Sequence, residues 1–342
     1  MRVLVTGGTG FVGSHTVAAL RAAGHELRLL VRSPERVGAA LAPLGVNTGF
    51  ELVHGDVTDE AAVGEALTGC DAVLHGAAVY SFDPRDSARV RATNVRGTEL
   101  VLGQGRRLGL DPIVQLSTFG VLLPAASGPL APDGPLGRSR SPYLRSKIEQ
   151  EVIARRLQKE GAPVVIVQPG SVWGPHDPHF GESEQMARTI LTRRMPIVPS
   201  GGFPVVDVRD LASALATVFR QGEGPRSYLL GGHYVRFPDL VRLLGKLTGR
   251  RLPALPLSET LILPLAHVAD VAQRALPFRL PMPTEGIWLT KHRARCDDSR
   301  ARAELSFGPR ELRETIADTV RSLVAERRLT AKQAGALAPA PA

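Results

Sequence analysis

The chain has 342 residues, of which 43% are hydrophobic and only 5% aromatic, so aliphatic side chains must build most of its core. A net charge of +9 permits nucleic-acid binding, but the Arg residues are scattered and not clustered with stacking aromatics, so no nucleic-acid partner is expected. Cys70 and Cys296 make no disulfide framework, and no run of about 18 apolar residues predicts a membrane span. With no signal-like apolar start, these features favour a reducing, cytoplasmic location.

Short apolar runs alternate with helical patterns through the first half of the chain. A repeat of strand, helix and strand with short links predicts an α/β fold with a Rossmann-type, doubly wound parallel sheet covered on both faces. Strands are expected at 2–6, 25–32, 50–57, 71–78, 111–118 and 163–170, and helices at 11–24 and 59–69.

The pattern loosens after about residue 175, where many helix breakers surround a single helical segment. We assign residues 1–175 to the sheet domain and expect residues 204–230 to return to it. Residues 176–203 and 231–325 are assigned to a smaller, mostly helical second region.

Two further segments of the second half are distinctive. Residues 257–276 are apolar but interrupted by Pro264, which favours a core or pocket-lining helix over the alternative, a helix on a membrane surface. The low-complexity tail, residues 330–342, is expected to be disordered.

A glycine-rich turn, "VTGGTGFVG", follows the first strand and opens the first helix. A dinucleotide pyrophosphate would meet backbone N–H groups and the positive helix end there, and glycine allows the phosphate to approach closely. A plain tight turn is the alternative. The candidate cofactor-binding residues of this turn are Gly7, Gly10, Phe11, Val12 and Gly13.

The ends of the next two strands bear on the choice of cofactor. Arg32 ends the second strand, where an NAD site usually carries Asp or Glu, and Arg36 lies one turn further on. These cations favour the 2′-phosphate of NADP(H) over NAD(H), although two ordinary surface arginines would look the same. Asp56 ends the third strand, either to bind the adenine amine or simply to cap a turn.

The segment "SPYLRSK" places Tyr143 four residues before Lys147, so both lie on one face of a helix. A nearby ammonium favours the phenolate and should lower the Tyr143 pKa from its ordinary value near 10. Lys is a compact charge with several donors, which also suits it to holding a ribose, whereas the planar Arg fork would not substitute easily.

In this order, the glycine turn, "HGDV", "LHGAA", "NVRGT", "LST" and "YLRSK" resemble the extended short-chain dehydrogenase/reductase superfamily of NAD-dependent epimerases and dehydratases. The resemblance continues through "QPGSVWGP" and "VDVRDLA" and covers nearly the whole chain. Within the superfamily, "AAVYSFDPRD" and the arginine after the second strand look most like dihydroflavonol reductases and 3-beta-hydroxysteroid dehydrogenases. The resemblance implies a small-molecule substrate and allows a homodimer, although some relatives are monomers.

The resemblance also implies roles for individual residues. Thr118 aligns with the hydroxyl that binds the substrate oxygen, next to Tyr143 and Lys147, whereas Ser117 is expected to bond to the backbone. Asn94 is expected to tie a helix to the fifth strand or to support a water molecule. Neither His15 nor His75 is expected to be a base. Cofactor contacts are implied for Val57, Ala77, Ala78, Asn94, Lys147, Pro169, Gly170 and Val172, and no metal is implied.

These features predict an NADP(H)-dependent oxidoreductase that interconverts a secondary alcohol and a ketone on a bulky, apolar substrate. The first alternative is an NAD-dependent nucleotide-sugar epimerase or dehydratase. Phe119 and Gly120 argue against dehydration, because sugar dehydratases place Asp-Glu after the catalytic Thr. Gln168 stands where many relatives have Arg, which puts pocket contacts borrowed from them in doubt. The second alternative, a non-enzymatic redox sensor, is disfavoured because both Tyr143 and Lys147 are retained.

Overall fold

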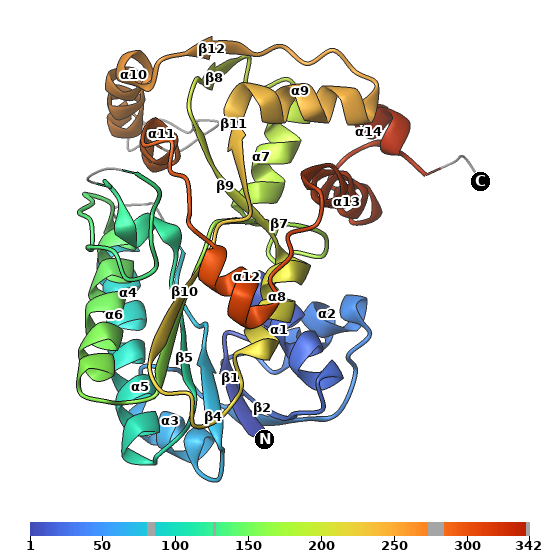
Figure 1. Cartoon of the computed structure of the whole chain (residues 1–342). Helices are drawn as coiled ribbons and strands as arrows, with labels where there is room; N and C mark the ends of the chain where they lie inside the picture. Colours follow the sequence, from blue (N-terminus) through green and yellow to red (C-terminus); the bar gives the residue numbers. More distant parts are fainter. Residues whose placement is uncertain (81–85, 126–127, 273–283, 340–342) are drawn as a thin grey trace.

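The computed structural model describes residues 1–80, 86–125, 128–272 and 284–339. A seven-stranded sheet forms one half of the molecule, and all its strand pairs are parallel (Figure 1). The strand order is β10 (Arg226–Leu230), β6 (Val164–Pro169), β5 (Ile113–Leu116), β4 (Ala72–His75), β1 (Arg2–Thr6), β2 (Glu26–Val31) and β3 (Phe50–His54). The predicted α/β fold class is confirmed.

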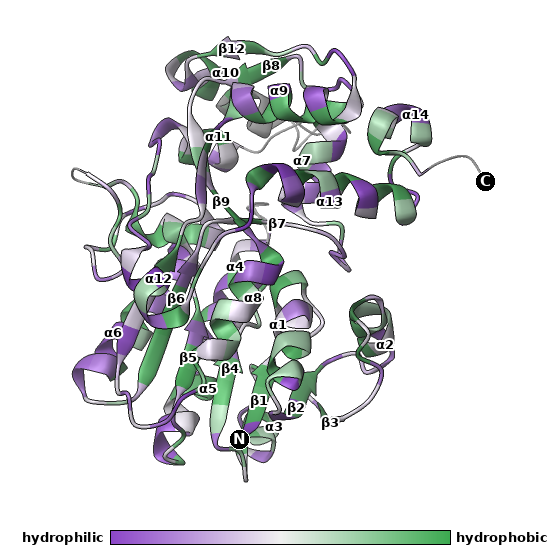
Figure 2. Cartoon of the chain, turned by 45° about the vertical axis from the view of Figure 1, so that its right-hand side comes forward, coloured by the Kyte–Doolittle hydropathy of each residue, from purple (hydrophilic) through white to green (hydrophobic). Residues whose placement is uncertain are grey.

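The strands of the sheet contribute apolar side chains to both of its faces, so helices cover both. In Figure 2 these strands are coloured mainly as hydrophobic. Side chains alternate along β1, so Val3 and Val5 face one core and Leu4 faces the other. The first core is completed by α1 (Phe11–Ala22), α2 (Glu35–Leu41), α8 (Val208–Thr217) and α12 (Ser299–Leu305). The second is completed by α3 (Glu60–Leu67), α5 (Gly97–Arg107) and α6 (Pro142–Lys159).

A smaller region with its own apolar core lies beyond one end of the sheet (Figure 1). Its helices are α7 (Glu182–Leu191), α9 (Phe237–Thr248), α10 (Glu259–Ala272), α11 (Thr284–Lys291) and α13 (Leu312–Ala325). Five short strands, β7 (Ser171–Trp173), β8 (Ile197–Pro199), β9 (Gly202–Asp207), β11 (His233–Arg236) and β12 (Leu255–Leu257), form two small sheets. These strands were not predicted, because three to six residues give too little alternation to recognise.

The segment 204–230 was predicted to return to the sheet domain. It supplies the edge strand β10 of the large sheet and α8, which packs in the first core. However, β7 and β9 pair with each other in the small three-stranded sheet, and Trp173 is buried in the second core. Residues 171–173 were expected in the sheet domain; their strand lies in the small sheet, while Val172 packs against the first core. The rest of the two-region division stays a prediction.

The apolar segment at 257–276 forms α10 as far as residue 272, with Pro264 inside the helix. Glu259 and Ala266 are buried, whereas Leu261 and Val268 are 64% and 69% exposed. In the described part of the chain, no helix is long and apolar enough to cross a membrane. Residues 273–276 lie outside the described residues, so the alternative of a membrane-surface helix stays open.

The tail is not disordered as far as residue 339, which corrects the prediction for residues 330–342. Residues Ala331–Ala334 form the short helix α14, and residues Gly335–Leu337 continue as a 3₁₀ turn. Thr330 and Gln333 form a reciprocal capping box, and Arg250 donates to the Gln333 carbonyl. These bonds give a low-complexity segment specific partners that composition does not reveal. Residues 340–342 lie outside the described residues.

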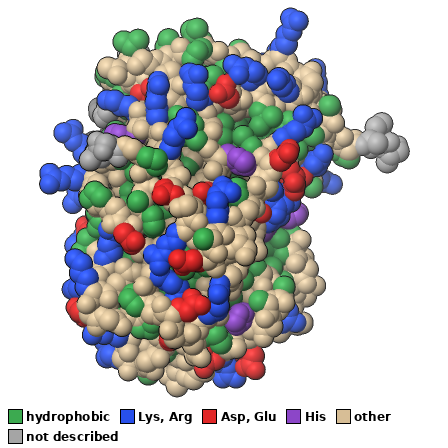
Figure 3. Space-filling view, viewed as in Figure 1, with side chains coloured by type: hydrophobic (Ala, Val, Ile, Leu, Met, Phe, Trp, Pro, Cys, Tyr) green, Lys and Arg blue, Asp and Glu red, His purple; other side chains and the backbone are tan. Residues whose placement is uncertain are grey.

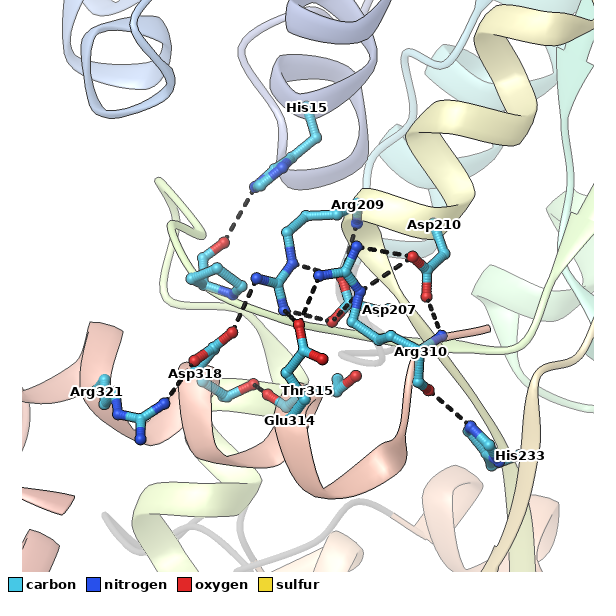
Figure 4. Close-up of polar contacts among 12 residues, drawn as sticks. His15, Asp207, Arg209, Asp210, His233, Arg310, Glu314, Thr315, Asp318 and Arg321 are labelled. Atoms are coloured by element: carbon cyan, nitrogen blue, oxygen red, sulfur yellow. Dashed lines mark hydrogen bonds and ion pairs between the residues drawn. The ribbon is translucent and has the colours of Figure 1, made fainter. Parts of the chain in front are cut away.

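Ion pairs join the end of the chain to the sheet half (Figure 4). Asp207 caps α8 by accepting from the Arg209 backbone N–H at 2.8 Å, and it also binds the Arg209 guanidinium. Arg209 in turn donates to Asp318 of α13 at 2.8 Å. Burial opposes ionisation of Asp207, yet the hydrogen bonds from Arg209 prevail and its pKa is lowered.

The surface carries its basic residues in a dispersed arrangement. On the face shown in Figure 3, Lys and Arg side chains lie over both halves of the molecule with Asp and Glu between them. Among the described residues, many arginines form ion pairs with neighbouring acids, for example Arg91 with Glu149 and Arg242 with Asp239. A solvated surface with dispersed charges of both signs and a positive excess is the simplest interpretation of this pattern.

We predict that Asp207→Asn lowers the free energy of unfolding by about 3 kcal/mol at pH 7, because it leaves Arg209 without its buried partner. A lowered folded-state pKa stabilises the fold above the ordinary Asp pKa of about 4 and loses that contribution as the pH falls. The difference between variant and wild type should therefore shrink below about pH 4. Urea unfolding over a pH series measures it. The matched control, Asp239→Asn, removes an exposed partner of Arg242 and should change little; a pH-independent difference would contradict the assignment.

Candidate active site

The carboxyl ends of the parallel strands gather the predicted site segments at one edge of the sheet. The glycine turn follows β1, the segment from Gly76 to Ala78 follows β4, and Ser117 and Thr118 follow β5. Pro169 and Gly170 lie at the end of β6. Since β1, β4, β5 and β6 are adjacent, residues far apart in the sequence reach a common edge.

The glycine turn has the geometry that a dinucleotide cradle requires. Gly7 has a φ of +77°, and the Gly10 N–H donates to the Gly7 carbonyl at 2.9 Å. A Cβ atom on Gly13 would lie only 2.0 Å from the same carbonyl oxygen, so α1 can approach β1 this closely only with glycine. Phe11 and Val12 begin the helix and are half-buried.

The start of α1 also fits an anionic group. Its N-cap, Gly10, provides no side-chain hydrogen bond, and its first turn has no acid. By contrast, Asp59 caps α3, Ser141 caps α6 and Asp207 caps α8 with side-chain oxygens. Because α1 keeps its first N–H groups and positive end free of such a cap, the residues present fit the pyrophosphate of a dinucleotide.

The residues predicted to select the cofactor lie near each other. The Arg32 guanidinium is 3.7 Å from the Asp56 carboxylate, with the two side chains 68% and 36% exposed. Asp56 also accepts from the backbone N–H and hydroxyl of Thr58, so the turn role expected as an alternative is present. Arg36 lies in the first turn of α2, one turn beyond Arg32. An exposed pair of this length is weak, and a phosphate could displace Asp56 from Arg32.

The segment after β4 is held by buried polar groups. The Ala77 N–H donates to the Thr6 hydroxyl at 3.2 Å, and the exposed Ala78 follows. Asn94 accepts from the Val79 N–H at 2.7 Å and donates to the Ser146 hydroxyl of α6 at 2.9 Å. Asn94 therefore ties this segment to α6, not to the fifth strand as predicted. The reason is that α6 packs directly against the π-helical turn, residues 92–96, that carries it.

Val57 and the residues after β6 have mainly packing contacts. Val57 is buried in the core beneath α3 and α5. The Gly170 N–H donates to the Leu230 carbonyl at 2.9 Å, and a Cβ there would lie 2.9 Å from the Gly231 oxygen. Pro169 ends β6 and Val172 lies in β7. Their contacts with a cofactor remain predictions.

Both histidines near the site have structural partners. His75 lies between the Thr6 and Thr98 hydroxyls at 2.8 and 3.1 Å, and burial, followed by the Lys147 charge, lowers its pKa to about 3. The His15 ring contacts the Pro175 carbonyl at 3.0 Å, and burial lowers its pKa to about 4. Both rings are therefore neutral near pH 7, as expected for residues that support the fold.

Tyr143 and Lys147 lie on the first turns of α6, which begins after Ser141 with Pro142 in the first helical turn. Lys147 is buried and donates from Nζ to the Leu116 carbonyl at 3.1 Å. Burial lowers its pKa to about 8, although the nearby Glu151 carboxylate opposes that shift. Leu116 ends β5, so Lys147 reaches across to the strand that precedes Thr118.

The predicted lowering of the Tyr143 pKa is wrong for the chain by itself. Burial raises this pKa, and Glu285 of α11 and Glu182 of α7 raise it further. The i, i+4 spacing correctly places Tyr143 and Lys147 on one face, but it carries no information on burial or on acids contributed by distant helices. At neutral pH, Tyr143 is consequently the protonated phenol.

Sequence reasoning missed three residues that surround Tyr143. The Tyr80 ring meets the Tyr143 ring edge-on at 4.6 Å between centroids, and its hydroxyl donates to Glu182. Burial, followed by the influence of Glu182, raises the Glu285 pKa to about 8 despite the Ser141 hydroxyl close by. Tyr80 lies within the quoted "AAVYSFDPRD" and could have been proposed, whereas nothing local marks Glu182 or Glu285.

The two hydroxyls after β5 point to different partners. Ser117 is buried and donates to the Glu151 carboxylate, not to the backbone as predicted, because Glu151 of α6 faces this strand end. Thr118 is half-buried, and its oxygen accepts from the Gly120 N–H at 3.3 Å. The Thr118 oxygen is thus an acceptor in this bond, and its proton can be donated to a substrate oxygen.

Comparison with known proteins identifies the class that this fold and site define. The model of the NAD dependent epimerase/dehydratase family matches residues 3–231. The chain therefore belongs to this family, the extended short-chain dehydrogenases/reductases, as predicted, and a dinucleotide cofactor, NAD(P), is typical of it.

Three relatives match over nearly the whole length of both proteins. The chain is 32% identical to sterol demethylase protein B of Methylococcus capsulatus, over 94% of this chain and 97% of that protein. It is 28% identical to a putative dihydroflavonol 4-reductase of Synechocystis, over 92% of each. It is also 28% identical to a farnesyl-dihydroquinoline-oxide ketoreductase of Stigmatella aurantiaca, over 94% and 96%. The crystal structure of gox2253 superposes with a TM-score of 0.81 at 29% identity, covering 96% and 99%.

We predict that Gly13→Ala destabilises the fold by about 1–3 kcal/mol and abolishes dinucleotide binding, because the new methyl group collides with the Gly7 carbonyl. The matched control is Gly38→Ala in α2, where a Cβ would have nothing within 4 Å. That variant should be neutral or more stable by about 0.5–1 kcal/mol. Thermal unfolding and cofactor fluorescence titration measure the two effects. Normal cofactor affinity in Gly13→Ala would show that the turn is no cradle.

Proposed function

We propose that the protein is an NADP(H)-dependent oxidoreductase that interconverts a secondary alcohol and a ketone. The observation that supports this proposal is that Lys147, one helical turn after Tyr143, donates to the Leu116 carbonyl, two residues before Thr118 and at the edge of the sheet where the glycine turn also lies. The chain belongs to the NAD dependent epimerase/dehydratase family, and two of its relatives are named as a reductase and a ketoreductase.

The proposed roles follow from the chemistry of each side chain. When bound, the nicotinamide supplies or accepts the hydride. Thr118 donates a hydrogen bond from its hydroxyl to the substrate oxygen and so holds it, while the protonated Tyr143 transfers its proton to that oxygen during reduction. Lys147, fixed by the Leu116 carbonyl, stabilises the phenolate that then forms and can bind the ribose.

NADP(H) is proposed over NAD(H) because Arg32 and Arg36 follow β2. Asp56 is close enough to pair with Arg32, but the exposed pair is weak, so a 2′-phosphate can compete for the guanidinium. Asp56 remains proposed as the group that meets the adenine amine. No described acid other than Asp56 is paired with Arg32, and that acid comes from the neighbouring strand end.

The substrate is proposed to be a bulky, mainly apolar ketone or alcohol. The relatives include proteins named for a sterol and for a farnesyl-bearing quinoline. Glu182 and Glu285 add polar groups beside Tyr143, yet a Glu285 pKa of about 8 leaves this residue mostly neutral at pH 7. A neutral carboxyl group is compatible with an apolar substrate and can hydrogen-bond to it.

The nucleotide-sugar and redox-sensor alternatives have less support. Phe119 and Gly120 are buried after Thr118, where a sugar dehydratase carries acids. The retained Tyr143 and Lys147 argue against a protein without catalysis. An NADPH-oxidation screen across bulky ketones and nucleotide sugars separates these functions, and turnover of nucleotide sugars alone would overturn the proposal.

Tyr143→Phe should keep cofactor binding and lose at least about a hundredfold in turnover, because only the proton donor is removed. Lys147→Arg should also fail, since the guanidinium cannot replace the buried ammonium. The control Tyr228→Phe removes a hydroxyl bonded to Glu304 and should leave turnover unchanged. Steady-state rates and NADPH titrations on the best substrate from the screen test this. Near-normal turnover of Tyr143→Phe would show the assignment to be wrong.

Arg32→Ala should weaken NADPH binding about ten- to a hundredfold and leave NADH nearly unaffected, because one charge-assisted hydrogen bond to the phosphate is lost. Arg32→Asp should reverse the preference by repelling the phosphate. Arg21→Ala is a suitable control, because this arginine donates to the Gly49 carbonyl and has no proposed cofactor role. Fluorescence titration with both cofactors decides the point. A loss shared equally by NADPH and NADH in Arg32→Ala would remove the phosphate role.

A further inference from the structure

Glu151 is a fully buried carboxylate that the proposed mechanism does not use. It lies on α6, one turn after Lys147 and two turns after Tyr143, so all three share a helix face. Its two oxygens accept from the Ser117 hydroxyl, the Gln168 side-chain amide and the Arg155 guanidinium. Donors on three different side chains hold this buried carboxylate in one place.

Two of the partners of Glu151, Ser117 and Gln168, directly follow a pair of residues that face each other on β5 and β6. Leu116 of β5 is paired with Val167 of β6, and the next residues along the two strands are Ser117 and Gln168. The Ser117 N–H also donates to the Val167 carbonyl at 2.8 Å. Glu151 therefore fastens both strand ends to α6 immediately before Thr118 on one strand.

Lys147 is bound to the same strand end. Its ammonium donates to the Leu116 carbonyl, next to the serine that Glu151 holds. Two charged or titratable groups interact with it electrostatically, Glu151 from α6 and His75 from β4, and His75 is neutral. Burial lowers the Lys147 pKa, and Glu151 is the group that opposes this shift.

Arg155 supplies the cation that balances Glu151. Its Nη2 and Nε atoms lie 2.8 and 3.1 Å from one carboxylate oxygen, and its Nη1 donates to the Gly134 carbonyl at 2.7 Å. Gln168, by contrast, contributes only a neutral amide. The cation paired with Glu151 is therefore Arg155, one turn later on the same helix, and residue 168 of β6 does not need to be charged.

We propose that Glu151 is a positioning residue that clamps the ends of β5 and β6 to α6 and thereby fixes Lys147 and Thr118 relative to each other. The clamp is a property of the chain itself, whereas its consequence for turnover rests on the proposed function. Replacing the carboxylate with a neutral amide of the same shape removes the charge and keeps the volume, so Glu151→Gln isolates the electrostatic part of the role.

The test uses the fact that the chain has only five lysines. The ammonium signals of Lys-labelled protein are followed by NMR over a pH series, and the Lys147 signal is assigned by its loss in Lys147→Arg. Glu151→Gln should move the Lys147 titration midpoint down by about one pH unit or more, because an opposite charge close by favours the ammonium. Glu149→Gln is the matched control: it changes a partly exposed acid of the same helix, paired with Arg91, and should not move the midpoint.

Arg155→Gln provides a second variant with the opposite sign, since removal of a cation should raise the Lys147 midpoint. It keeps the test decisive if Glu151→Gln does not fold. An unchanged Lys147 midpoint in a folded Glu151→Gln protein, or an equal shift in Glu149→Gln, would overturn the clamp. A shift in the opposite direction in Glu151→Gln would do so as well.

Turnover separates the clamp from the proposed function. In an active enzyme, Glu151→Gln should lower kcat more than it raises KM and should move the alkaline fall of kcat to lower pH. A wild type that turns over no ketone, yet shows the expected Lys147 shifts, would refute the proposed function and leave the clamp standing. If the wild type is active on ketones but Glu151→Gln leaves the Lys147 titration unchanged, the clamp is refuted and the proposed function stands.

Discussion

The site depends on two ionisable side chains, Lys147 and Glu151, that are buried away from water and therefore need fixed polar partners. Both residues lie on α6, and Glu151 favours the cationic form of Lys147. Lys147 is bound to the end of β5 through the Leu116 carbonyl, and Glu151 is bound to it through Ser117. Removing either charge from water is costly unless partners are prearranged, and the parallel sheet supplies them at fixed positions. Thr118 and the end of β6 are located by the same contacts.

The rest of the fold can be understood as the support for that edge. Adjacent parallel strands bring the glycine turn, Ala77 and Thr118 together, since their carboxyl ends all face one way. The segment returning at 204–230 closes the sheet with β10 and positions α8 against α1. Through Arg209 and Asp318, α8 is then joined to α13, so this helix of the smaller region is linked through α8 to α1, which begins at the glycine turn.

The sequence predicts the parts of this site that depend on local spacing. Tyr143 and Lys147 share a helix face, and Gly7 and Gly13 make the close turn, because both follow from fixed backbone geometry. It fails where the outcome depends on distant elements: burial of Tyr143 in the folded chain, followed by the effects of Glu285 and Glu182, reverses the expected pKa shift. The same limit explains the partner of Ser117, the tie made by Asn94 and the ordered tail up to residue 339.

The two perturbed groups also bear on the direction of the proposed reaction. Burial raises the Tyr143 pKa and lowers that of Lys147 to about 8, so at neutral pH the chain alone presents a phenol beside an ammonium that is not far from losing its proton. A phenol is the state that donates a proton, as reduction of a ketone requires. Oxidation of an alcohol needs the phenolate instead, and the burial of Tyr143 opposes its formation. The chain alone therefore presents the protonation state from which the proposed reduction starts, and in that proposal the Lys147 ammonium stabilises the phenolate once it forms.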